Sequence, residues 1–93
     1  MHYYIHLEST LSKVNKAPNE TISVVLIDDE SHSRKTLRSF LKDYCPQVEV
    51  IGEADSVLSG YKLLQHESPD AIFLDVQMND GTGFDLLNKI PNP

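Results

Sequence analysis

The 93-residue chain has no tryptophan, a single cysteine and no excess of basic residues. One cysteine cannot form an intramolecular disulfide, so a small disulfide-stapled secreted domain is excluded and a reducing setting is expected. The net charge of −6 disfavours direct binding to nucleic acid or to an anionic membrane, because both select basic surfaces. No apolar run is long enough for a signal peptide or a membrane helix. These absences predict a soluble cytoplasmic domain.

The acidic charge that is present lies in one part of the chain. Residues 1–21 carry two glutamates and two lysines, so the whole net charge of −6 falls in residues 22–93. We interpret residues 1–21 as a poorly defined N-terminal extension, in which the segment YYIHL is a weak candidate for a short strand. Residues 22–93 are predicted to form one domain, whose excess of carboxylates suits a cation or a basic partner.

Three apolar segments alternate with three amphipathic ones from Thr21 onward. We expect buried strands in the segments TISVVLID, VEVIGEA and PDAIFLD. We expect helices from residue 31 or 32 to residue 44, in SVLSGYKLLQHE with Asp55 or Ser56 as N-cap, and in GTGFDLLNKI. In the first of these, Leu37, Leu41 and Tyr44 form one apolar stripe at helical spacing, with Phe40 beside them. Strands joined by helices run parallel with right-handed crossovers. The predicted fold class is therefore α/β, a three-layer parallel sheet.

Two of the three predicted strands end in acidic residues. Asp28 and Asp29 follow the first strand, and Asp75 ends the third. If these two strands are neighbours, about 4.8 Å apart, the three carboxylates converge at one end of the sheet. Their mutual repulsion then calls for a divalent cation, and oxygen ligands of this kind suit Mg²⁺. The alternative is that Asp28 to Glu30 merely cap the following helix.

The segments VVLIDDE, VIGEADS, PDAIFLDVQM and DGTGFDLL, in this order and spacing, resemble the receiver domain of two-component response regulators. The resemblance implies a flavodoxin-like fold with strand order 2-1-3-4-5, of which residues 22–93 hold the first three βα units. The segments GEADS and DGTGFDLL are most similar to the corresponding segments of regulators that carry a LytTR-type DNA-binding domain and act in transcription regulation.

The resemblance also implies roles for particular residues. Asp75 would be the phosphoacceptor for a phosphoryl group that comes from a sensor histidine kinase. Asp28, Asp29, Asp75 and the backbone carbonyl of Gln77 would hold Mg²⁺. Complete receivers use a Ser or Thr from the fourth unit and a Lys from the fifth to bind the phosphoryl group, and neither position occurs in these 93 residues.

Three functions stay open at this point. The first is a phosphorelay receiver that modifies itself and is not an enzyme in the ordinary sense. The second is a degenerate or truncated receiver that acts as a non-catalytic protein-interaction module. The third, a Mg²⁺-dependent phosphatase, is disfavoured because such enzymes place an acid two residues after the nucleophile, where this chain has Gln77.

The resemblance has a consequence for assembly. With only three units, the strand AIFLD, Ala71 to Asp75, would be an open edge with unpaired backbone groups, and Phe40 on the first helix would lose its cover. We therefore predict a homodimer through the exposed edge of this third strand. One alternative is that the N-terminal YYIHL acts as a surrogate strand on that edge, and another is a soluble but partly molten monomer.

Overall fold

The computed structural model describes residues 3–7 and 20–90. The main sheet has four strands: β1 (Tyr3–Leu7), β2 (Ile22–Ile27), β3 (Val48–Ala54) and β4 (Ala71–Asp75). Helices in the described residues are α2 (Ser31–Tyr44), α3 (Val57–His66) and α4 (Gly83–Lys89). A separate two-stranded hairpin lies between β4 and α4 and consists of β5 (Gln77–Met78) and β6 (Gly81–Thr82).

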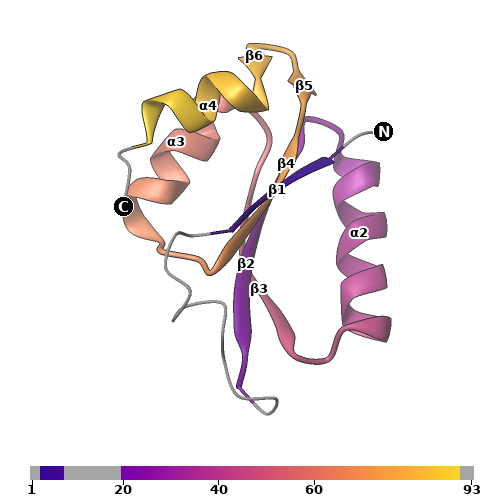
Figure 1. Ribbon diagram of the computed structural model, residues 1–93. Helices are drawn as coiled ribbons and strands as arrows, with labels where there is room; N and C mark the ends of the chain where they lie inside the picture. Colours follow the sequence, from indigo (N-terminus) through magenta and orange to yellow (C-terminus); the bar gives the residue numbers. More distant parts are fainter. Residues whose placement is uncertain (1–2, 8–19, 91–93) are drawn as a thin grey trace.

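The sheet has the strand order β1-β4-β2-β3, and β2 runs parallel to both β3 and β4. The first predicted strand is thus central, between the second and the third, as the resemblance implied. Helix α2 covers one face, and helices α3 and α4 cover the other (Figure 1). The predicted fold class is confirmed: the three predicted strands run parallel in one sheet with flanking helices, consistent with a partial flavodoxin-like receiver fold, and β1 adds an antiparallel strand to its edge.

The alternation of side chains along the strands divides the core into two layers. On one face, Val25 and Ile27 pack with Leu86 of α4 and Val57 of α3. On the other face, Val24 and Leu26 pack with Leu41 of α2. Because both faces of β2 are covered, its side chains from Val24 to Ile27 are fully buried, which explains the continuous apolar run in the sequence.

The helix termini follow local sequence signals. Ser56 is the N-cap of α3, as one of the two predicted candidates, and its hydroxyl accepts a hydrogen bond from the Ser59 N–H at 2.9 Å. Thr82 is the N-cap of α4, and its hydroxyl accepts a hydrogen bond from the Asp85 N–H at 3.1 Å. Among the helices of the described chain, none combines the length and apolarity needed to cross a membrane.

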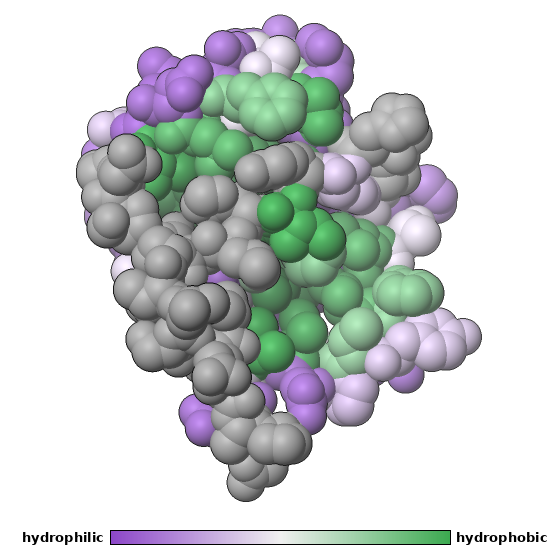
Figure 2. Space-filling model, viewed as in Figure 1, coloured by the Kyte–Doolittle hydropathy of each residue, from purple (hydrophilic) through white to green (hydrophobic). Residues whose placement is uncertain are grey.

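One face of α2 is more exposed than its periodicity predicted. Leu41 is buried, but Tyr44, predicted to share its apolar stripe, is 72% exposed. Phe40 is 55% exposed, in agreement with the expected loss of cover, and its ring lies 4.9 Å from that of Tyr44. Figure 2 shows hydrophobic surface gathered on the side of the molecule between β1 and α2. Periodicity identified the apolar stripe correctly, but nothing covers all of it within the described residues.

The open edge predicted for the third strand is wrong, because β1 occupies it. Strand β1 runs antiparallel to β4 from the pair Tyr3↔Asp75 to the pair Leu7↔Ala71. The alternative, in which YYIHL acts as a surrogate strand, is confirmed. The homodimer prediction required an unpaired AIFLD edge, and that premise fails for the described residues. The division of the chain at residue 21 stays a prediction, although part of the first segment belongs to the sheet.

Candidate acidic site

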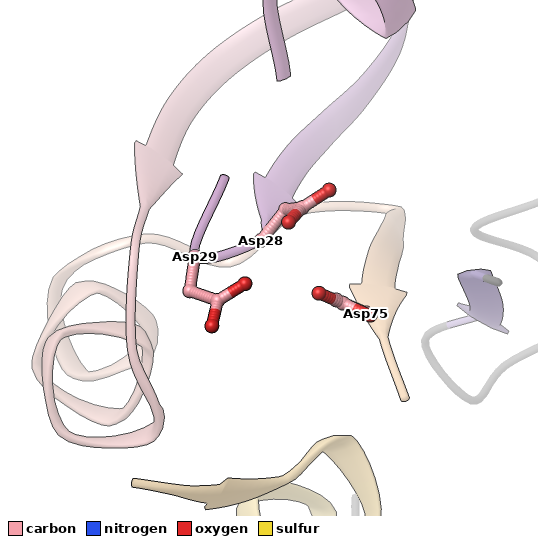
Figure 3. A group of neighbouring side chains, drawn as sticks. All are labelled: Asp28, Asp29 and Asp75. Carbon is pink, nitrogen blue, oxygen red and sulfur yellow. The ribbon is translucent and has the colours of Figure 1, made fainter. Parts of the chain in front are cut away.

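The three predicted aspartates come together at the carboxyl end of the sheet. Asp28 and Asp29 follow β2 directly, and Asp75 is the last residue of β4. The parallel pairing of Ile27 with Leu74 brings these two strand ends side by side. One carboxylate oxygen from each aspartate lies within 4.8 Å of the others. Figure 3 shows the carboxylates of Asp29 and Asp75 directed toward each other across the gap.

Asp28 is the most enclosed member of the cluster, with only 1% of its surface exposed. Its Oδ1 accepts a hydrogen bond from the backbone N–H of Glu30 at 2.9 Å, and its Oδ2 accepts one from the hydroxyl of Tyr3. Glu30 is the N-cap of α2 but makes no side-chain cap hydrogen bond. Glu30 therefore does not cap α2 through its side chain, and the capping alternative remains only for Asp28, which accepts a hydrogen bond from the N–H of this N-cap residue.

Asp75 is half-buried and its ionised form is disfavoured. Burial, together with the neighbouring carboxylates of Asp28 and Asp29, raises the pKa of Asp75 to about 6. A hydrogen bond from the Gln77 N–H to its Oδ1, at 3.2 Å, acts in the opposite direction. A positive ion placed between these carboxylates would remove the repulsion that opposes ionisation.

The donor set fits a small divalent cation. All three groups are carboxylates, which are the hard oxygen ligands that Mg²⁺ prefers. Octahedral Mg²⁺ with bonds of about 2.1 Å places adjacent ligand oxygens about 3.0 Å apart and opposite ones about 4.2 Å apart. The three carboxylate oxygens, which lie within 4.8 Å of one another, would have to move closer together to share one ion. The backbone of Gln77 lies at the site through its N–H, while the metal role predicted for its carbonyl stays a prediction.

The loop after Asp75 is held against the site by close contacts that the sequence analysis did not identify. The N–H of Gly83 donates to the carbonyl of Val76 at 3.0 Å. A Cβ at position 83 would lie 2.6 Å from the Asp75 carbonyl oxygen and 2.7 Å from Leu74 Cγ. Only glycine permits this approach, so Gly83 fixes the start of α4 beside the end of β4.

Asp80 connects the same loop to α3 through hydrogen bonds. Its carboxylate oxygens accept hydrogen bonds from the N–H groups of Val57 and Leu58 at 2.8 and 3.1 Å. These bonds lower the pKa of the Asp80 carboxyl. Because they satisfy N–H groups in the first turn of α3, they link the β5–β6 hairpin to that helix.

Arg34 stabilises the segment that carries Asp28. It lies in the first turn of α2 and donates to the backbone carbonyl of Asp28 at 2.5 Å. Its Nε lies 3.1 Å from Glu53 of β3, which also pairs with Arg38. These contacts hold the chain after β2 between α2 and β3.

Comparison with known proteins agrees with this geometry. The sequence model of the family "response regulator receiver domain" matches residues 24–93. The sensory transduction protein LytT of Bacillus cereus is 39% identical over 75 residues, which cover 77% of this chain and 30% of that protein. LytT of Enterococcus faecalis is 40% identical over 67 residues, which cover 72% of this chain and 27% of that protein.

A third relative carries the name of an enzyme. The protein-glutamate methylesterase/protein-glutamine glutaminase of group 3 operon from Bradyrhizobium diazoefficiens is 36% identical over 73 residues, or 78% of this chain and 20% of that protein. No solved structure matches the chain. The chain thus spans less than a third of the length of these curated relatives. The matched segment contains all three aspartates, and the chain belongs to the response regulator receiver domain family of two-component systems.

Proposed function

We propose that Asp75 accepts a phosphoryl group from a phosphohistidine of a sensor histidine kinase, in a site where Asp28, Asp29, Asp75 and the Gln77 carbonyl hold Mg²⁺. The observation that carries this proposal is the convergence of three carboxylates within 4.8 Å at the carboxyl ends of neighbouring parallel strands. An ordinary structural role does not account for such a cluster, since its mutual repulsion destabilises the fold.

The residues of the chain have distinct parts in this reaction. An oxygen of Asp75 attacks the phosphorus atom, a P–O bond forms and the P–N bond to the donor imidazole breaks. The Gln77 N–H, bonded to Oδ1, fixes the orientation of the attacking carboxylate. Mg²⁺, when bound, offsets charge on the phosphoryl oxygens. The carboxylates of Asp28 and Asp29 draw the cation to this position.

The test is Mg²⁺-dependent modification of the full chain by the small phosphodonor acetyl phosphate, followed by intact mass. The wild-type chain should gain one phosphoryl group in Mg²⁺ and none in EDTA, and Asp75→Asn should gain none. Asp43→Asn, which changes an exposed carboxylate on α2, is the matched control and should behave as the wild type. Equal modification of wild type and Asp75→Asn would refute Asp75 as the acceptor.

A second candidate function is a non-catalytic protein-interaction module. The observation in its favour is that both oxygens of Asp28 already accept hydrogen bonds from the protein itself. An unmodified mass for the wild type at saturating Mg²⁺ and acetyl phosphate would support this candidate over the first.

The wider setting follows from the first proposal. We place the chain in the cytoplasm as the phosphorelay part of a transcription regulator of the LytTR type, without direct contact to nucleic acid. Support comes from the acidic net charge and from the two LytT relatives. The methylesterase among the relatives shows that receivers also occur with enzymes, so the absence of an enzymatic activity stays a prediction.

A further inference from the structure

The phenol of Tyr3 lies across the acidic site. Tyr3 is paired with Asp75 in the β1–β4 register, and β2, which leads to Asp28, is the next strand beyond β4. Two strand spacings separate β1 from β2, which amounts to about 10 Å. The Tyr3 hydroxyl nevertheless donates a hydrogen bond to Asp28 Oδ2. Its side chain therefore passes over the end of β4, on which Asp75 lies.

With this hydrogen bond, both carboxylate oxygens of Asp28 accept a hydrogen bond from the protein. The Oδ1 atom accepts from the Glu30 N–H, and the Oδ2 atom accepts from Tyr3. A cation, or a water molecule bound to it, needs oxygen lone pairs that face the site. Because Asp28 is 1% exposed, solvent offers it few other partners, and a cation must compete with the phenol O–H for the lone pairs of Oδ2.

We propose that Tyr3 is a displaceable latch on the acidic site, which competes with the divalent cation for Asp28. The inference rests on the proposed function, since it concerns the same metal site. In the metal-free chain, the hydroxyl supplies a hydrogen-bond donor that partly offsets the charge of Asp28. When the cation binds, that donor leaves, and the N-terminal end of β1 is released from the site. By linkage, the cation and the docked Tyr3 weaken each other equally.

The position of β1 suits a displaceable element. Within residues 3–7 and 20–90 it is an edge strand whose ladder hydrogen bonds are made to β4. Ile5, in the middle of the strand, is 51% exposed. Local opening of an edge strand costs less than global unfolding.

The test is calorimetric titration of the full chain with Mg²⁺ alone, near pH 7. Tyr3→Phe keeps the ring and removes only the hydroxyl. We expect it to bind Mg²⁺ more tightly than the wild type, by up to about tenfold, because a hydrogen bond to a charged group no longer has to be broken. Tyr44→Phe makes the same chemical change at a side chain that is 72% exposed on α2, and should leave the affinity unchanged.

A second measurement uses the wild type and does not depend on how the variant folds. With tyrosine labelled with ¹³C at Cζ, the Tyr3 resonance should move on Mg²⁺ saturation toward that of a phenol bonded to water, and the Tyr44 resonance should not. Tyr3→Phe and Tyr44→Phe assign the two signals. A Tyr3 resonance that does not respond to Mg²⁺ would overturn the latch.

The outcomes separate the two proposals. If wild type, Tyr3→Phe and Tyr44→Phe all bind Mg²⁺ with equal affinity, the latch is wrong and the metal site stands. If Tyr3→Phe binds more weakly, the phenol supports the cation, and the latch is again wrong. If none of the three binds Mg²⁺, the metal site of the proposed function is refuted, and the latch with it.

Discussion

Replacing Asp75 by Asn in the metal-free protein tests whether the carboxylates are crowded. Asn has nearly the same shape, keeps an oxygen for the Gln77 N–H and removes one negative charge from the cluster. We expect Asp75→Asn to raise the free energy of unfolding near pH 7 when Mg²⁺ is removed with EDTA. The gain should disappear near pH 4, because the wild-type carboxyl is then protonated and neutral as well.

The size of this effect follows from the geometry. Two unit charges 4.8 Å apart repel by about 0.9 kcal/mol in water and by about 3.5 kcal/mol at an effective dielectric near 20. A rise of the pKa from 3.8 to about 6 corresponds to about 3 kcal/mol. Because Asp75 is only half-buried, solvent screening reduces that figure, and we expect about 1 kcal/mol.

The pH dependence has a definite sign. The folded-state pKa of Asp75 lies above its unfolded value, so the folded protein holds this proton more tightly. Stability contributed by Asp75 is therefore lost as the pH rises from about 4 to about 6. Urea denaturation in EDTA at several pH values measures this, with Asp43→Asn as a control at an exposed carboxylate. An Asp75→Asn variant that is no more stable near pH 7, or equally more stable near pH 4, would refute the reasoning.

Three other predictions concern the acidic site, the packing around Gly83 and the oligomeric state. Asp28→Asn should stabilise the metal-free protein by about 1 kcal/mol in thermal melts, because it removes a like charge from the cluster. The same variant should bind Mg²⁺ more weakly in calorimetry. A variant that is less stable than the wild type in EDTA would contradict this prediction. Gly83→Ala should lower the free energy of unfolding by about 1–3 kcal/mol in urea, because its Cβ meets the Asp75 carbonyl, whereas Ser39→Ala on the exposed surface of α2 should not. Light scattering should show a monomer, because β1 already pairs with the β4 edge; a stable dimer would contradict this.

Much of this fold could be predicted because its signals are local. The buried run from Val24 to Ile27, the helical periodicity that follows it and the cap at Ser56 each depend on a few adjacent residues. The convergence of Asp28, Asp29 and Asp75 needed one further step, namely that parallel strands end at the same side of a sheet. That rule is general, so the acidic site was accessible from the sequence.

The remaining features depend on tertiary context. Two-residue strands are too short for a periodic pattern, although the dipeptide Asp80-Gly81 is a recognised hairpin signal, and Gly81 does adopt a positive φ of 147°. Tyr44 lies at helical spacing from Leu41, but periodicity does not say what covers a stripe. Tyr3 meets Asp28 only through the register of an edge strand, and no local pattern fixes that register.

The pairing of β1 with β4 also has a consequence for the order of folding. During synthesis Tyr3–Leu7 emerges early, but its partner Ala71–Asp75 emerges only after β2 and β3. Closing such a distant pair costs loop entropy that local contacts do not repay, so β1 should join the sheet late. Until then, the β4 edge is free to pair with another chain. The nascent protein therefore passes through an aggregation-prone interval that ends when its own N-terminal strand docks.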